Sequence, residues 1–171
     1  MPTFTRLLIV VATTLFCSTG SAQTGKPRVS PAQTESYKIG QAKITINYSS
    51  PSVRDRKIWG WLVPYDKVWR AGANEATTFE TDKDIRVGGK PLPAGKYGFF
   101  LIPRATGPWT AVFNTVSNQW GAFKYDSTMD QLRVDVSPRA TADSTEVLAY
   151  TITGEGFSLS WEKLVIPVPV N

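Results

Sequence analysis

The residues best suited to binding or chemistry gather in residues 63–78, which read V-P-Y-D-K-V-W-R-A-G-A-N-E-A-T-T. We name this segment the central stretch. Its residues follow neither a helical nor a strand period, and Gly72 interrupts any helical pattern. Irregular segments rich in polar and aromatic residues are where a β scaffold usually places its functional groups. The candidate ligand-binding residues here are Trp69, Arg70, Asn74 and Glu75.

A second irregular segment, residues 116–130 and named the second loop, combines aromatic side chains with amides and a carboxylate in the same way. A sugar is typically held by an aromatic face under its ring and by planar polar side chains at its hydroxyls. The aromatic residues of both segments could supply that face, while Arg70, Glu75 and the amides could supply hydrogen bonds. The candidate ligand-binding residues of the second loop are Asn118, Gln119, Trp120 and Tyr125.

A structural role for the same residues is equally compatible with the sequence. Arg70 could form a bidentate pair with Glu75 or Asp126, while the amides satisfy backbone groups of the two irregular segments. We expect Arg70 and Glu75 to lie close together across the turn at Gly72, with Trp69 and Trp120 beside them. The first interpretation is therefore a structural or interaction domain with an envelope protein as partner. A carbohydrate-like binding module is its alternative.

A third interpretation is an enzyme that uses carboxylates, such as Glu75 and Asp126 in glycoside cleavage, which requires two carboxyls at a defined separation. The sequence contains no histidine, and its single cysteine is Cys17. Ser-His-Asp and Cys-His nucleophile systems are thus excluded. Zinc, copper and haem sites lose their commonest ligands, although a hard cation held by oxygen atoms stays compatible. We assign no catalytic residue, no metal ligand and no cofactor.

The remaining sequence predicts a β scaffold for these segments. Apolar and polar residues alternate in residues 42–48, 77–81, 109–114, 132–136, 148–152 and 157–161, as expected for half-buried strands. Residues 96–102 are apolar on both faces, which predicts a central strand covered on both sides. Gly88 and Gly89 supply the positive φ of a tight hairpin after residues 85–87. Pro167 and Pro169 in the last strand, residues 164–170, predict an unpaired edge.

These patterns together predict an all-β fold, an antiparallel two-sheet β-sandwich of about nine short strands with two long irregular loops. No segment shows an amphipathic helical stripe of useful length. Trp59 and Trp61 would share a face if residues 54–61 were extended. They would then either cap the core or form an aromatic platform.

Four pieces of the sequence resemble a known family. They are Y-S-S-P-S-V-R-D-R-K-I-W-G from Tyr48, L-V-P-Y-D-K-V-W-R-A-G-A-N-E-A-T-T from Leu62, L-P-A-G-K-Y-G-F-F from Leu92 and N-Q-W-G-A-F-K-Y-D from Asn118. The chain resembles the secreted bacterial family catalogued as domain of unknown function 2911 (DUF2911). Trp61 departs from the family's pattern, where we expect an acidic residue. The resemblance implies export and a single globular domain, and it implies no established activity.

The start of the chain resembles a secretory signal. Arg6 supplies a positive n-region, residues 7–16 an apolar h-region, and Gly20-Ser21-Ala22 a small-residue cleavage site. The apolar run is shorter than the roughly 20 residues of a membrane span. We therefore expect a signal peptide at residues 1–22, a flexible leader at 23–34 and one β-sandwich domain at 35–171. The exported protein would be periplasmic or extracellular, with no transmembrane segment after cleavage.

The charge of the chain indicates no nucleic-acid partner. The sequence has 19 Lys and Arg against 14 Asp and Glu, a formal net charge of +5. The basic residues are scattered, with only Arg54, Arg56 and Lys57 close together around Asp55, whereas nucleic-acid binding requires a basic stripe. We interpret the charge as favouring solubility, with weak attraction to anionic surfaces.

Overall fold

The structure, a computed structural model, describes residues 27–171. The predicted signal peptide (1–22) and the first part of the predicted leader (23–26) lie outside the described residues. The described chain forms ten β-strands and one short 3-10 helix. They are β1 (Ala32–Ile39), β2 (Ala42–Ser49), β3 (Thr77–Thr81), β4 (Ile85–Val87), β5 (Lys90–Leu92), β6 (Gly95–Ile102), β7 (Trp109–Asn114), η1 (Ser127–Met129), β8 (Asp130–Val136), β9 (Arg139–Thr153) and β10 (Gly156–Pro169).

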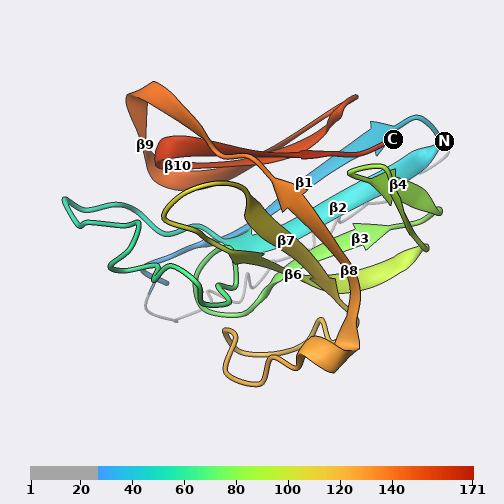
Figure 1. Ribbon diagram of the computed structural model, residues 1–171, viewed down its shortest axis with the longest axis horizontal. Helices are drawn as coiled ribbons and strands as arrows, with labels where there is room; N and C mark the ends of the chain where they lie inside the picture. Colours follow the sequence, from blue (N-terminus) through green and yellow to red (C-terminus); the bar gives the residue numbers. More distant parts are fainter. Residues whose placement is uncertain (1–26) are drawn as a thin grey trace, which may run out of the picture.

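Six strands form one antiparallel sheet in the order β1-β2-β3-β6-β7-β8 (Figure 1). The alternation predicted for β2 is confirmed, because Ile44 and Ile46 are buried while Lys43 is exposed. β6 lies between β3 and β7 and is buried from Tyr97 to Ile102. The prediction of a central strand with both faces covered is therefore confirmed.

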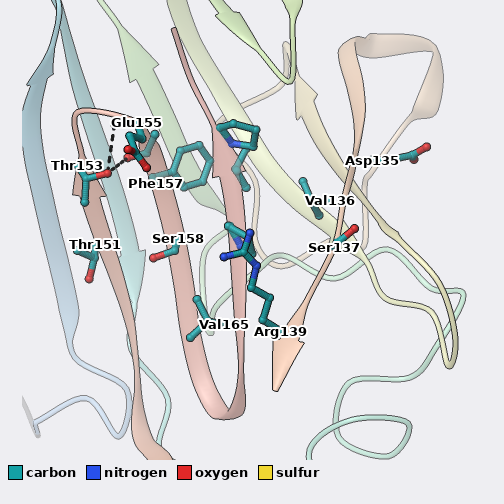
Figure 2. Close-up of a pocket in the computed structure, with 14 residues that line it drawn as sticks. Asp135, Val136, Ser137, Arg139, Thr151, Thr153, Glu155, Phe157, Ser158 and Val165 are labelled. Carbon is teal, nitrogen blue, oxygen red and sulfur yellow. Dashed lines mark hydrogen bonds between the residues drawn. The ribbon is translucent and has the colours of Figure 1, made fainter. Parts of the chain in front are cut away.

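The second sheet consists of β9 and β10, which cross over one face of the first sheet (Figure 1). β10 turns back on itself near Val165 (Figure 2), after a positive φ of 53° at Glu162. The backbone N–H of Val170 consequently donates to the carbonyl oxygen of Glu155, at 3.0 Å. The two strands predicted at 157–161 and 164–170 thus belong to the two arms of β10, and the fold is an antiparallel β-sandwich as predicted.

A small hairpin of β4 and β5 forms the third sheet. Gly88 and Gly89 connect the two strands with φ of 55° and 77°. Both residues of a two-residue type I′ turn need positive φ, which glycine adopts without steric cost. The hairpin predicted from this pair of glycines is confirmed.

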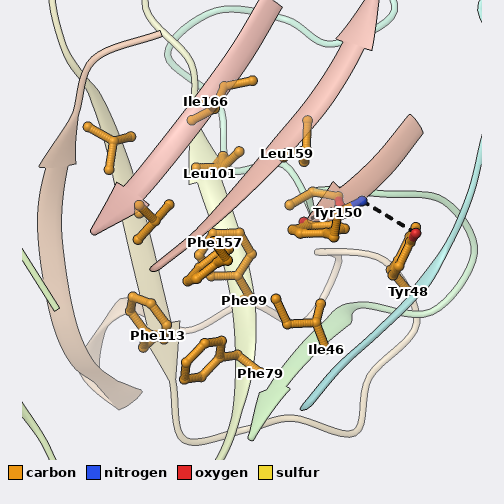
Figure 3. Packing of buried hydrophobic residues seen from close by; sticks show 14 of the residues in the cluster. Ile46, Tyr48, Phe79, Phe99, Leu101, Phe113, Tyr150, Phe157, Leu159 and Ile166 are labelled. Carbon is orange, nitrogen blue, oxygen red and sulfur yellow. Dashed lines mark hydrogen bonds between the residues drawn. The ribbon is translucent and has the colours of Figure 1, made fainter. Parts of the chain in front are cut away.

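Aromatic side chains fill the space between the two larger sheets (Figure 3). Phe79 and Phe99 of the first sheet lie 5.2 and 5.3 Å from Phe157 of β10, measured between ring centroids. Tyr48 of β2 and Tyr150 of β9 meet edge to face at 4.7 Å. Removing one such buried ring typically costs about 3–5 kcal/mol, so these contacts determine how the sheets pack.

The opposite face of the first sheet is covered by the second loop. Phe100 and Val112 point away from the sandwich and form a smaller buried cluster with Ala76. The ring of Tyr125, from the second loop, packs against Phe100 at 5.2 Å between centroids. This packing holds the second loop beside the central stretch.

The chain enters the sheet earlier than predicted. β1 begins at Ala32, within the segment that we expected to be a flexible leader, and the backbone N–H of Ser50 donates to the carbonyl oxygen of Pro31. Only Ile39 of β1 is buried. Since an edge strand of this kind is held mainly by backbone hydrogen bonds to β2, its side chains show no apolar alternation that would predict it.

Candidate functional site

The central stretch and the second loop meet, and their backbones are hydrogen-bonded. The N–H of Ala76 donates to the carbonyl oxygen of Gln119 (2.9 Å), and the N–H of Gly121 donates to that of Asn74 (3.0 Å). Glu75 and Trp120 form the antiparallel bridge between them. The two irregular segments are therefore joined by main-chain groups rather than by side-chain ion pairs.

The central stretch is also fixed to both sheets. Trp69 exchanges two backbone hydrogen bonds with Leu101 of β6, at 2.8 and 2.9 Å. The carbonyl oxygen of Ala71 accepts hydrogen bonds from the hydroxyls of Thr77 and Tyr150, at 3.1 and 2.8 Å. Arg70 thus projects from a backbone that is anchored on either side.

The prediction that Arg70 and Glu75 form a pair is wrong. Glu75 instead accepts two hydrogen bonds from the guanidinium of Arg28, at 2.8 and 2.9 Å, and these bonds lower the pKa of its carboxyl. Ala71 and Asn74 adopt the left-handed conformation with φ of 51° and 56°. These two turns send the side chains at positions 70 and 75 into different surroundings, which the sequence spacing alone does not reveal.

Trp69 does not offer an open aromatic face. Its side chain is buried and stacks on Trp161 of β10, with centroids 5.8 Å apart and an interplanar angle of 15°. Trp59 packs edge-on against both rings and against Trp109. These four residues form a tryptophan cluster at one end of the core, so a sugar ring cannot stack on Trp69.

A cleft of about 330 Å³ opens beside the tryptophan cluster, and we name it the arginine cleft. Three arginines from two segments of the chain line it, and none of its lining residues is acidic. Val29 and Ser30, from the N-terminal segment that precedes β1, form part of its wall. Its lining includes the side chains of Arg54, Arg56, Trp69, Arg70, Asn74 and Trp161.

Two of the three arginines are positioned by the loop after β2. Arg56 donates from Nε to the carbonyl oxygen of Val53 (3.0 Å) and from Nη2 to that of Ser52 (2.6 Å). Arg54 has a φ of 50°, and its backbone N–H donates to the carboxylate of Glu146. Neither guanidinium forms an ion pair with a carboxylate of residues 27–171.

Arg70 is the most unusual of the three. Its guanidinium is half-buried, its Nε is buried without an acceptor among residues 27–171, and burial lowers its pKa. A Cβ placed on Gly121 would lie 3.9 Å from its Nη1, so the side chain reaches the second loop. Leaving a buried charge without a counter-charge is costly, and proteins commonly keep such groups at functional sites.

The tryptophan cluster supplies further unused donors. The buried indole N–H groups of Trp59 and Trp161 have no acceptor within the described part of the chain, whereas that of Trp109 donates to the carbonyl oxygen of Arg104. Trp161 lines the arginine cleft. Trp59 does not line it, so the buried donors at the cleft that are unpaired within residues 27–171 are the Nε of Arg70 and the indole N–H of Trp161, and these favour a ligand rich in acceptors.

The other predicted site residues lie away from this cleft or have structural partners. Asn74 lines the cleft, but its Nδ2 donates to the carbonyl oxygen of Ser30 (3.1 Å). Gln119 is buried and donates to the carbonyl oxygen of Val116, while Asn118 and Trp120 are exposed on the second loop. None of the second-loop candidates lines the arginine cleft.

Tyr125 belongs to a separate hydrogen-bond network. Its hydroxyl donates to the carboxylate of Asp130, and Arg133 donates to the same hydroxyl at 2.9 Å. Burial, followed by the hydrogen bond to Asp130, raises its pKa to about 12. This network ties the second loop to β8.

The two carboxylates considered for glycoside cleavage, those of Glu75 and Asp126, both have hydrogen-bond partners in the fold. Hydrogen bonds lower the pKa of both Glu75 and Asp126, the former through Arg28 and the latter through Thr128. Asp126 is the N-cap of η1. Each carboxylate thus already has a structural partner, and neither environment favours the protonated carboxyl that serves as the acid of a glycosidase.

A larger concavity, of about 560 Å³, lies between the end of β8 and the arms of β10 (Figure 2). Thr151, Thr153 and Ser158 contribute polar side chains to it. None of the buried polar atoms that lack a partner belongs to its lining. It therefore resembles the ordinary hydrated outside of a sheet.

The described residues give no sign of a metal centre or a membrane-spanning helix. No group of three or more His, Cys, Asp or Glu side chains within residues 27–171 is arranged to hold a metal ion. In the same part of the chain, no helix is long and apolar enough to cross a membrane.

Sequence reasoning missed Arg28, Arg54, Arg56 and Trp161. The close basic residues 54, 56 and 57 are a visible signal in the sequence, but a short charged run of this kind also favours solubility alone. Trp161 alternates with Phe157 and Leu159, so its position in the sequence indicated only the core.

Comparison with known proteins identifies a family. No curated protein and no solved structure matches the chain. Residues 30–170 match the family described as Protein of unknown function (DUF2911). The chain therefore belongs to the DUF2911 family, as the motifs around Trp69 and Trp120 indicated.

Proposed function

We propose that the protein is a binding module for a small ligand that bears an oxyanion, either a carboxylate or a phosphate, and that this ligand binds in the arginine cleft. The observation behind the proposal is the half-buried guanidinium of Arg70, which has no acceptor for its Nε among residues 27–171. Arg54 and Arg56 add positive charge, and no lining residue is acidic. A bound oxyanion would supply the missing counter-charge.

A purely structural role explains the neighbouring residues better than it explains Arg70. Backbone hydrogen bonds join the two irregular segments, and Asn74 and Glu75 hold the N-terminal segment through Ser30 and Arg28. The guanidinium of Arg70 contributes no ion pair to these connections within residues 27–171, and its Nε has no acceptor there. A ligand is therefore the better explanation for a charge kept in this position.

The side chains favour an oxyanion over a neutral sugar. The rings of Trp69 and Trp161 are buried, so the cleft has no open aromatic face for a sugar ring. Guanidinium groups match carboxylate and phosphate oxygens in a planar, bidentate geometry. A volume of about 330 Å³ lies near the lower limit of small-molecule pockets, which supports a small ligand.

Thermal melts with a panel of small anions test this proposal. Citrate and glucuronate represent carboxylates, inorganic phosphate represents phosphates, and glucose is the neutral control. A ligand at about 100 times its Kd stabilises the folded state by about 2.7 kcal/mol. Arg70→Met should abolish the shift, whereas Arg86→Met, at the exposed position of strand β4, should keep it.

Two outcomes would contradict the proposal. If no anion of the panel raises the Tm of the wild type above the effect of glucose and sodium chloride, the cleft does not bind a small oxyanion. A shift that persists unchanged in Arg70→Met would place the anion elsewhere. A larger shift with phosphate than with the carboxylates, or the reverse, identifies the class.

We also propose that the protein is exported to the periplasm or the cell exterior. The proposal is supported by the n-region, the apolar run and the Gly20-Ser21-Ala22 site of residues 1–22. Intact-mass measurement on protein from the envelope fraction tests it. A chain beginning at Gln23 is expected, and a mass that retains residues 1–22 or a lipid on Cys17 contradicts it.

A further inference from the structure

We propose that the loop tip formed by Trp61 and Leu62 docks on the surface of an anionic lipid bilayer. Trp61 is 76% exposed and Leu62 is 42% exposed, although most large apolar residues of the described chain are buried. The two residues are adjacent and form one apolar point on the surface. The tip adjoins the arginine cleft, because Leu62 also lines that cleft, but docking on a bilayer does not require a ligand there.

The tip is held in a fixed shape. The N–H of Gly60 donates to the carbonyl oxygen of Val63, and the N–H groups of Trp61 and Val63 donate to that of Ile58, at 2.9 to 3.2 Å. The side chains of Ile58 and Val63 are buried at 2% and 1% exposure. The exposed pair is therefore presented by anchored neighbours, and little conformational entropy is lost when it binds.

Gly60 shows that this shape depends on the sequence. It has a φ of 78°, and a Cβ at this position would lie 2.6 Å from the ring of Tyr65. The close approach of that ring needs a glycine. The turn therefore keeps Trp61 pointing outward while Trp59, two residues earlier, packs into the tryptophan cluster.

The charge around the tip complements an anionic surface. Arg54, Arg56 and Lys57 precede the tip and are exposed, and Asp55 is the one acidic residue among residues 54–62. Each Lys or Arg close to an anionic membrane strengthens binding about fivefold. Tryptophan is enriched at the membrane–water interface because its ring is apolar and its N–H can still be hydrated.

The small size of the apolar tip favours a bilayer over a folded protein partner. A stable protein interface buries about 1,200–2,000 Å² in total, far more than two side chains can supply. Peripheral membrane binding needs only shallow apolar insertion combined with a basic patch. The tip offers both of these features.

Co-sedimentation with vesicles tests the inference. Vesicles of phosphatidylcholine containing phosphatidylglycerol are compared with vesicles of pure phosphatidylcholine, with the wild type and a Trp61→Ser/Leu62→Ser variant. The wild type should bind the anionic vesicles, and the double variant at least tenfold more weakly. Lys57→Gln should weaken binding about fivefold. Trp120→Ser, which removes an indole that is 59% exposed on the second loop, is the matched control and should bind as the wild type does.

Three results would overturn the inference. Equal binding to both kinds of vesicle, or absence of binding to either, refutes it. So does equal binding by the wild type and the double variant, provided that a urea melt shows both to be folded. If vesicle binding fails while small anions still stabilise the protein, the loop tip is not a docking surface, and the proposal for the arginine cleft is unaffected.

Discussion

Replacement of Arg70 by methionine should stabilise the protein. Methionine has a chain of similar length to the aliphatic stem of arginine, so most of the packing is retained, while the half-buried charge is removed. The guanidinium of Arg70 has no ion pair with residues 27–171, and its Nε has no acceptor there. The substitution therefore removes the cost of burying an unpaired charge and breaks no ion pair.

The expected size of the effect follows from the surroundings of this side chain. A buried polar group without a partner costs about 1–3 kcal/mol. Since Arg70 is only half-buried, the lower part of this range applies. We expect an increase of about 1 kcal/mol in the free energy of unfolding, and a rise of about 3 °C in Tm for a domain of this size.

Urea melts in a buffer without polyvalent anions measure this change. The m-value should stay constant, because the surface exposed on unfolding does not change. Arg56→Met is the matched control within the same cleft. Its guanidinium donates to the carbonyl oxygens of Ser52 and Val53, so its replacement should lower stability by about 1–2 kcal/mol.

A result of opposite sign would refute the reasoning. If Arg70→Met lowers the free energy of unfolding by more than about 1 kcal/mol, the guanidinium makes favourable interactions in the folded protein. Arg70 would then have a structural role. If the variant is more stable but still responds to small anions as the wild type does, Arg70 is a strained residue rather than a ligand-binding one.

Three further predictions concern other parts of the fold. Glu75→Gln should change the Tm by no more than about 2 °C, because its pair with Arg28 is about half exposed on both sides and is screened by salt; a larger loss contradicts this. The pKa of Tyr125 is raised to about 12 from 10.0, so its contribution is complete below pH 10 and is lost as the pH rises toward 12. In alkaline urea melts Tyr125→Phe should therefore lose less stability over this interval than the wild type, and identical losses would exclude the effect. Gly156→Ala should destabilise by about 2–4 kcal/mol, since its Cβ would clash with the carbonyl oxygen of Val168 in the other arm of β10, at a φ of 138°. Gly154→Ala, which meets no atom within 4 Å, should be tolerated, and equal effects at both positions would show that the clash is relieved.

Local patterns in the sequence determined much of the scaffold. The alternation of β2, the apolar run of β6 and the paired glycines of the β4–β5 hairpin each predict a structure that depends on neighbouring residues in the chain. The motif around Trp69 was specific enough to indicate the family. The meeting of the central stretch with the second loop was also expected, although the sequence did not show that backbone groups make the connection.

Only the tertiary structure decided which charged groups meet. Glu75 pairs with Arg28, which is 47 residues away in the sequence, and Arg70 lies in one cleft with Arg54 and Arg56. Spacing along an irregular segment does not define side-chain direction, because a single residue with positive φ redirects the chain. Ala71 and Asn74 make two such turns between the residues that were expected to pair.

Long-range backbone pairing likewise decided the edges of the two sheets. β1 is held to β2 by its main chain and carries mostly exposed side chains, so its sequence contains no apolar period. The second arm of β10 lies beside the first because Gly156 admits its backbone at close range. Main-chain hydrogen bonds are available to nearly every residue type, so the identity of the residues does not reveal which distant strands will use them.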